Sequence, residues 1–253
     1  MANTLLDLFE KNPQLLEWRD KVTLLSRQLV MGFSGSSKAV VMASALSEQV
    51  PKILIVTSTQ NEAEQLTGDL SAILGEDKVY SFFADDVVAA EFIFASPEKT
   101  HSRLESLNFL IDKESSGILV TSLVGTKLHL PNPEVYKDSR IDLTLGEEHD
   151  LEALSKHLTH IGYQRVEQVL SPGEFSRRGD ILDIYELTAE LPYRLEFFGD
   201  EIDGIRQFDS DSQKSLDNLE HIIVSPADDI ILTREDYQRA EKALESAVSK
   251  AEG

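Results

Sequence analysis

Apolar and polar positions follow different rhythms in the two halves of this 253-residue chain. In the first half, short apolar runs are separated by segments in which apolar residues recur at helical spacing. The pattern predicts strands over residues 28–33, 51–57, 78–83 and 118–122, two helices within 3–26, and helices that end at Ser47 or cover 61–74 and 97–113. Apolar strands that alternate with helices of this length are typical of a parallel sheet covered on both faces.

The alternation stops between residues 124 and 142, where glycine and proline interrupt it. We expect four segments: a P-loop-like (RecA-type) α/β domain over 1–125, a linker over 126–142, a small α+β domain with an antiparallel sheet over 143–230, and a charged helix over 231–253 that leads into the rest of a longer protein.

Local signals in the second half predict its elements individually. A strand over 141–145 precedes a helix that Asp150 caps and Gly162 ends. Beyond this helix apolar and polar residues alternate, and Gly199-Asp200 fits a type II′ turn between two antiparallel strands. Gly204 interrupts the alternation in the second of these strands, which predicts a bulge.

Composition excludes several classes of function. The chain has 24 Lys and Arg against 45 Asp and Glu, a formal net charge of −21, so it lacks the basic surface that binding a phosphate backbone requires. It has no cysteine, which excludes disulfides and thiolate metal sites. His157 and His160 lie on one predicted helix without a third ligand, so we expect no metal and no other cofactor. No apolar run approaches the roughly 18 residues of a membrane span, and the cytoplasm is the simplest location.

The segment Gly32–Ala39 has the position and spacing of a phosphate-binding loop between a strand and a helix. Gly32, Gly35 and Lys38 fit that loop, but two positions depart from it. Ser37 replaces the glycine before the lysine, and its Cβ crowds the approach of phosphates. Ala39 replaces the hydroxyl residue that holds Mg²⁺. We interpret the segment as a degenerate loop that keeps the turn without the chemistry; the alternative is weak residual binding of a nucleotide or anion.

Three arginines, Arg165, Arg177 and Arg178, lie close together in a part of the chain that is otherwise acidic. Each could pair with a nearby carboxylate, and exposed pairs of that kind contribute ~0–1 kcal/mol and imply no function. Alternatively, Tyr163 and Phe175 beside three guanidinium groups have the composition of an interface hot spot. Strict alternation puts Arg177 and Arg178 on opposite faces, so we expect at most one of them at the centre of an interface.

Two blocks in the same region resemble a known module. Pro172-Gly-Glu-Phe-Ser-Arg-Arg-Gly-Asp-Ile-Leu-Asp-Ile-Tyr185 and Arg194-Leu-Glu-Phe-Phe-Gly-Asp-Glu-Ile-Asp-Gly-Ile-Arg-Gln-Phe-Asp209 are similar to the module shared by the excision-repair protein UvrB and the Mfd family of transcription-repair coupling factors. UvrB has an intact phosphate loop and a tyrosine-rich, damage-probing hairpin. Here the loop is degenerate, and residues 80–97 are too short and too poor in tyrosine for that hairpin. The chain therefore resembles the N-terminal, UvrB-like region of the Mfd family.

The resemblance implies a non-catalytic adaptor that binds the damage sensor UvrA and recruits nucleotide excision repair to lesions that block transcription. It assigns UvrA-binding arginines to Arg165 and Arg178 and matches Phe175 to the family aromatic. A third family arginine falls on Ser176, where Arg177 is the candidate substitute. It also implies contacts with C-terminal domains of the same protein, and contacts with RNA polymerase and DNA only through downstream domains that include an ATP-dependent translocase.

Two other functions remain open from the sequence. A nucleotide-binding ATPase module would need a Mg²⁺ ligand in place of Ala39, and nucleotide would then shift its melting temperature. A UvrB-like module that binds damaged DNA would show tight, salt-dependent DNA binding. The acidic balance and the missing hairpin disfavour this second alternative.

Overall fold

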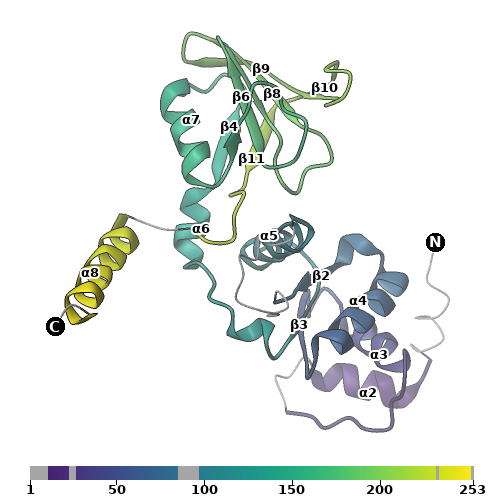
Figure 1. Ribbon diagram of the computed structural model, residues 1–253. Helices are drawn as coiled ribbons and strands as arrows, with labels where there is room; N and C mark the ends of the chain where they lie inside the picture. Colours follow the sequence, from purple (N-terminus) through teal and green to yellow (C-terminus); the bar gives the residue numbers. More distant parts are fainter. Residues whose placement is uncertain (1–10, 23–26, 85–96, 232–233, 252–253) are drawn as a thin grey trace. The chain divides into compact units, whose positions relative to one another are not determined.

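The computed structural model describes residues 11–22, 27–84, 97–231 and 234–251 (Figure 1). The chain divides into two compact units, residues 1–129 and 130–253. Of the two helices expected within residues 3–26, one is α2 (Pro13–Val22), and the residues of the other lie outside the described ranges. None of the described helices has the length and apolar character needed to cross a membrane.

The first unit contains a three-stranded parallel sheet with strand order β1-β3-β2, which confirms the predicted α/β class. Besides α2, its elements are α3 (Ser37–Ala45), β1 (Lys52–Thr57), α4 (Gln60–Leu74), η1 (Glu76–Lys78), β2 (Val79–Phe82), α5 (Pro97–Ile111), β3 (Gly117–Ser122) and η2 (Gly125–Lys127). Every residue of the central strand β3 is buried. Helix α4 begins where the Thr59 side chain accepts a hydrogen bond from Glu62 N at 3.2 Å, and it ends at Gly75, whose φ is 95°.

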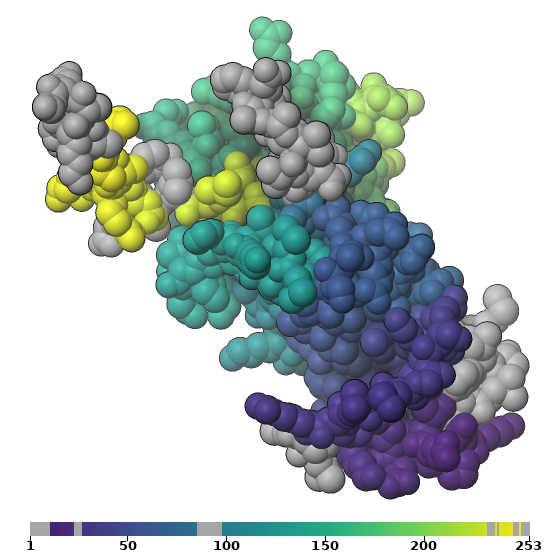
Figure 2. Space-filling model, turned by 60° about the horizontal axis from the view of Figure 1, so that its bottom comes forward, coloured from purple at the N-terminus to yellow at the C-terminus, as the bar shows by residue number. Residues whose placement is uncertain are grey.

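Two predictions for this unit are wrong. Residues 28–33 form no strand, and Leu29 and Met31 are 85% and 78% exposed; the space-filling view shows this N-terminal stretch on the outside of the unit (Figure 2). An apolar run becomes a strand only where a neighbouring strand pairs with its backbone groups, and no described strand pairs with this run. The edge strand β1 is also not covered on both faces: Ile55 packs against α3 and α4, whereas Leu54 and Val56 are exposed.

The second unit contains a six-stranded sheet in the order β10-β9-β8-β7-β6-β5 and a separate antiparallel pair, β4 and β11. Its elements are α6 (Pro133–Ser139), β4 (Ile141–Thr144), α7 (Leu151–His160), β5 (Gln164–Arg165), β6 (Glu174–Arg178), β7 (Ile181–Ile184), β8 (Tyr193–Phe198), β9 (Glu201–Phe208), β10 (Ser215–Leu219), β11 (His221–Val224) and α8 (Arg234–Ala251). All neighbours in the large sheet are antiparallel except β5 and β6. These two run parallel, contrary to the prediction, because a loop rather than a hairpin turn joins them.

The segment predicted to be a linker contains helix α6. The Asn132 side chain accepts a hydrogen bond from Glu134 N at 2.9 Å, and Pro133 occupies the first helical position. Asn-Pro here therefore starts a helix instead of interrupting the structure. The imidazole Nε2 of His157 on α7 lies 3.1 Å from the carbonyl oxygen of Ser139, so α6 and α7 are in contact.

The predicted boundaries of α7 are confirmed. Asp150 Oδ1 accepts hydrogen bonds from Glu152 N at 2.8 Å and Ala153 N at 3.1 Å, and these bonds hold the pKa of Asp150 below its usual value. Gly162 has φ 101°, as expected for a residue that ends a helix. Helix α7 lies beside the strands of this unit (Figure 1), and its apolar residues form the core together with the large sheet and the β4–β11 pair.

The hairpin of β8 and β9 is also confirmed. Gly199 has φ 68° and starts the two-residue turn. The register then moves from Phe197↔Ile202 to Glu196↔Gly204, which leaves Asp203 without a partner and forms the predicted bulge. The β6–β7 hairpin has a second turn of the same type of sequence, Gly179-Asp180.

Candidate partner-binding surface

The structure separates Arg177 from Arg178, as the alternation predicts. Phe175 and Arg177 point to the α7 side of β6: Phe175 is fully buried in the core, and Arg177 Nη1 donates to Glu152 Oε2 of α7 at 2.8 Å. Arg178 points to the other side, where its Nη2 donates to Asp183 Oδ2 of β7 at 2.9 Å. Of these two arginines, only Arg178 therefore lies on the sheet face opposite α7.

Asp183 is the centre of an ion cluster on that face. Its carboxylate is 1% exposed and accepts two hydrogen bonds from Arg194, at 2.7 Å from Nε and 2.9 Å from Nη2. The hydrogen bonds to Asp183 raise the pKa of Arg194 further, against the lowering effect of burial. The Arg194 guanidinium also lies 4.4 Å from the centre of the Phe208 ring. The buried Asp183 carboxylate thus accepts two hydrogen bonds from Arg194 and a third from Arg178, which is the more exposed of the two arginines.

Arg178 and Arg165 are the arginines of the predicted site that a partner can reach. The side chain of Arg178 is 52% exposed although one of its N–H groups is held by Asp183. Arg165 is exposed on the edge strand β5, and none of the residues that the structure describes forms a hydrogen bond or ion pair with its side chain. Arg165 pairs with Phe175 across the ladder, and paired residues point to the same side of a sheet. A partner that contacts both arginines must therefore reach around the β5 edge.

The two aromatic residues of the predicted site are core residues. Phe175 is fully buried, and Tyr163 is 2% exposed with its hydroxyl donating to Ser225 O at 2.8 Å. Burial is the main cause that raises the pKa of Tyr163 well above its ordinary value. We therefore correct their predicted role: neither ring presents a surface to a partner, and both pack beneath the strands that carry the arginines.

Ser176 is buried as well, and its hydroxyl donates to Glu167 O at 2.8 Å, which ties the β5–β6 loop to β6. Sequence analysis did not single out Asp183. The available signal was a lone carboxylate in an otherwise apolar strand, Ile181–Ile184.

In the degenerate loop of the first unit, the Ser37 hydroxyl and the Lys38 ammonium group contact other groups of the protein itself. Gly32 and Gly35 have φ 93° and 55°, and the Ser37 hydroxyl closes the loop by donating to Ser34 O at 2.6 Å. Lys38 Nζ lies 3.4 Å from Glu62 Oε1 of α4, and Ala39 is fully buried in the core. The lysine is directed at a carboxylate, where a phosphate-binding loop would direct it at phosphates.

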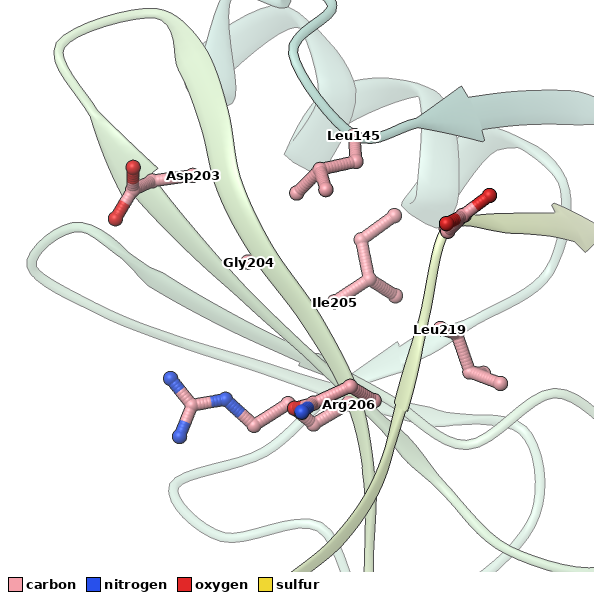
Figure 3. Close-up of a pocket in the computed structure, with 8 residues that line it drawn as sticks. Leu145, Asp203, Gly204, Ile205, Arg206 and Leu219 are labelled. Atoms are coloured by element: carbon pink, nitrogen blue, oxygen red, sulfur yellow. The ribbon is translucent and has the colours of Figure 1, made fainter.

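A depression of about 570 Å³ lies near the other edge of the large sheet (Figure 3). Leu145, Leu219 and the β9 residues Asp203 to Arg206 line it, and the Arg206 guanidinium is already paired with Glu196. It contains none of the predicted site residues. In the described parts of the chain, no group of three or more His, Asp or Glu side chains lies close enough to hold a metal ion.

Comparisons with known proteins show what the unit that carries these arginines is similar to. A family model described as the UvrB interaction domain matches residues 141–229. The chain is 35% identical over 225 residues to the transcription-repair-coupling factor of Bacillus subtilis (strain 168) and 33% identical over 219 residues to that of Staphylococcus haemolyticus (strain JCSC1435). These alignments cover 89% and 87% of the chain but 19% of each relative.

The matches confirm the resemblance that the two sequence blocks indicate. Residues 141–229 match the UvrB interaction domain, in a chain that is similar to a part of the transcription-repair-coupling factors.

Proposed function

We propose that this chain is a non-catalytic adaptor that binds UvrA through the β5–β6 edge of its six-stranded sheet. Bound in this way, it would recruit nucleotide excision repair to lesions that block transcription. The family match and the homology to transcription-repair-coupling factors support this proposal. The observation that carries it is the exposed guanidinium of Arg165, with which no residue in the described ranges forms a hydrogen bond or ion pair.

Charge makes Arg165 and Arg178 unusual in their domain. Residues 143–230 contain 7 Lys and Arg against 20 Asp and Glu, a balance of 7 − 20 = −13. Arginine offers a planar fork that binds carboxylates with two hydrogen bonds. Two accessible forks on one edge of an acidic domain suit a partner that presents carboxylates or backbone carbonyls in matching positions, and the acidic surroundings disfavour nucleic acid as that partner.

The first unit supports the non-catalytic part of the proposal. Lys38 is engaged by Glu62, and Ala39 cannot ligate Mg²⁺. In the proposal, residues 1–125 form a RecA-type domain that has lost nucleotide chemistry. RNA polymerase, DNA and an ATP-dependent translocase would be reached only through other regions of a longer cytoplasmic protein, whose C-terminal domains would also contact this chain.

Binding of purified UvrA to the 253-residue chain tests the proposal. We expect the wild type to bind without DNA, and Arg165→Ala and Arg178→Ala each to weaken binding by about 2 kcal/mol, as truncation of an interface hot spot does. Lys214→Ala is the matched control, because it removes one exposed cation from the same domain near the opposite edge strand, β10. Equal weakening by all three substitutions would mean that only net charge matters, and a folded wild type that does not bind would refute the proposal.

A further inference from the structure

Phe198 is an exposed aromatic residue that the core of the second unit does not use. It is the last residue of β8, directly before the Gly199-Asp200 turn, and it is 81% exposed. Its neighbour Phe197 is 7% exposed and packs in the core. A ring that is mostly exposed contributes little to the stability of the core. Aromatic rings are enriched, however, among the residues that anchor interfaces.

Strand pairing places Phe198 on the same face as Arg178. Arg178 lies opposite Ile181, and Ile181 lies opposite Glu196. Phe198 follows Glu196 by two positions on β8, so its side chain also points away from α7. With roughly 4.8 Å between strands and 3.4 Å per residue, two strands and two residues separate Arg178 and Phe198 by about 12 Å. A single interface of about 800 Å² per partner covers that distance.

The two hairpin turns lie together at this end of the sheet. Phe197 N, next to Phe198, donates to Asp180 O of the neighbouring turn at 2.9 Å. Asp180 and Asp200, one in each turn, are both exposed. Phe198 is therefore close to the carboxylates of the two turns and to exposed Glu201, its cross-strand partner, while Arg178 lies farther along the same face.

The contact with Asp183 fixes one end of the Arg178 guanidinium before any partner binds. Arginine has five N–H donors, and the structure assigns one of those of Arg178 to Asp183. The other donors are left on a side chain that is 52% exposed but anchored at one point. An anchored fork loses less conformational entropy on binding than a freely rotating one.

We propose that Phe198 is the apolar anchor of the surface that contains Arg178, and that Asp183 positions the Arg178 fork. The partner surface would be an apolar pocket with a carboxylate on the side that faces Arg178 and basic residues on the side that faces Asp180 and Asp200. This inference rests on the proposed function and takes UvrA as that partner, because Phe198 and Arg178 share one continuous face.

The test of the anchor measures binding of UvrA to the 253-residue chain and to Phe198→Ala. We expect a Kd about 30-fold weaker than that of the wild type, with an unchanged melting temperature because the ring is exposed. The matched control is Leu216→Ala, since Leu216 is a 50% exposed apolar residue on the far edge strand β10. Its Kd should stay within about twofold of wild type. In the double variant with Phe198→Ala and Arg178→Ala, the two fold-losses of affinity should multiply, because sites about 12 Å apart act independently.

A double-mutant cycle tests the positioning role. Asp183→Asn should weaken UvrA binding in the wild-type background and have no further effect on the folded Arg178→Ala variant, because the fork that it positions is then absent. A purely structural role of Asp183 would weaken both backgrounds equally and overturn the positioning claim.

The failure of the inference differs from the failure of the proposed function. If Arg165→Ala and Arg178→Ala lose affinity while Phe198→Ala binds like the wild type, the anchor is refuted and the adaptor remains. If the folded wild type does not bind UvrA, both are refuted.

Discussion

Replacing Asp183 should destabilise the second unit far more than replacing Arg178, its exposed partner. Asp183→Ala leaves Arg194, whose side chain is 14% exposed, without the carboxylate that binds it at 2.7 and 2.9 Å. The remaining polar contacts of Arg194 are to Gln213, at 3.4 and 3.2 Å. Removing one partner of a buried ion pair costs about 3–5 kcal/mol. Arg178→Ala removes only the outer contact, worth about 0–1 kcal/mol at its exposure, and leaves the Asp183–Arg194 pair intact.

Hydrogen exchange and tryptophan fluorescence together measure the stability of the two units separately. Amides of β6 to β8 report on the second unit, and the fluorescence of Trp18, the only tryptophan in the chain, reports on the first. We expect Asp183→Ala to reduce protection in β6 to β8 by roughly 10²- to 10⁴-fold, and Arg178→Ala to reduce it less than about fivefold. The Trp18 unfolding transition should not move. Equal losses in the two variants would refute the reasoning, because the cluster would then not depend on the buried pair.

Three further predictions concern Tyr163, Asp150 and the degenerate phosphate loop. Tyr163→Phe should lower the free energy of unfolding of the second unit by about 0.5–1.5 kcal/mol, measured by the same exchange, because it removes the hydrogen bond that the Tyr163 hydroxyl donates to the carbonyl oxygen of Ser225; an unchanged free energy would contradict this. The pKa of Asp150 is lowered in the folded state, so its contribution to α7 is present above the unfolded value of about 3.9 and is lost as pH falls through the folded value. Exchange in α7 should therefore accelerate below that pH in the wild type and be less pH-dependent in Asp150→Asn, and identical pH profiles would contradict this. Millimolar Mg·ATP should leave the Trp18 transition unchanged, because Lys38 is paired and Ala39 offers no ligand; a shift would revive the ATPase alternative.

Signals confined to a few neighbouring residues predicted the structure well. The Asp150 cap, the Gly162 stop and the Gly199 turn depend on backbone geometry within one turn of the chain, so the sequence contains all the information needed. The Gly204 bulge belongs to the same class. Asn132-Pro133 was misjudged because its proline was weighed as a breaker, whereas the pair starts helix α6.

Predictions that depend on distant residues failed. The apolar run at 28–33 has the composition of a buried strand, but no described strand pairs with it. The exposure of Leu54 and Val56 depends on what covers β1, which the strand's own residues do not specify. Both errors come from treating apolar composition as evidence of burial, when burial is set by the packing partners.

The candidate site shows the same division. Alternation correctly placed Arg177 and Arg178 on opposite faces. Composition did not reveal that Phe175 and Tyr163 face the core, because hot-spot composition and core composition are alike in aromatic residues. The role of Asp183 was hidden because Arg194 reaches it from the next strand, eleven positions along the chain.

A hydrogen-exchange footprint of UvrA on the 253-residue chain tests the central claim most directly. The account predicts slower exchange at β5 and β6 and at the Gly179-Asp180 and Gly199-Asp200 turns, with no change in α3 to β3 of the first unit. Protection confined to the first unit, or no protection anywhere in a folded chain at saturating UvrA, would contradict it.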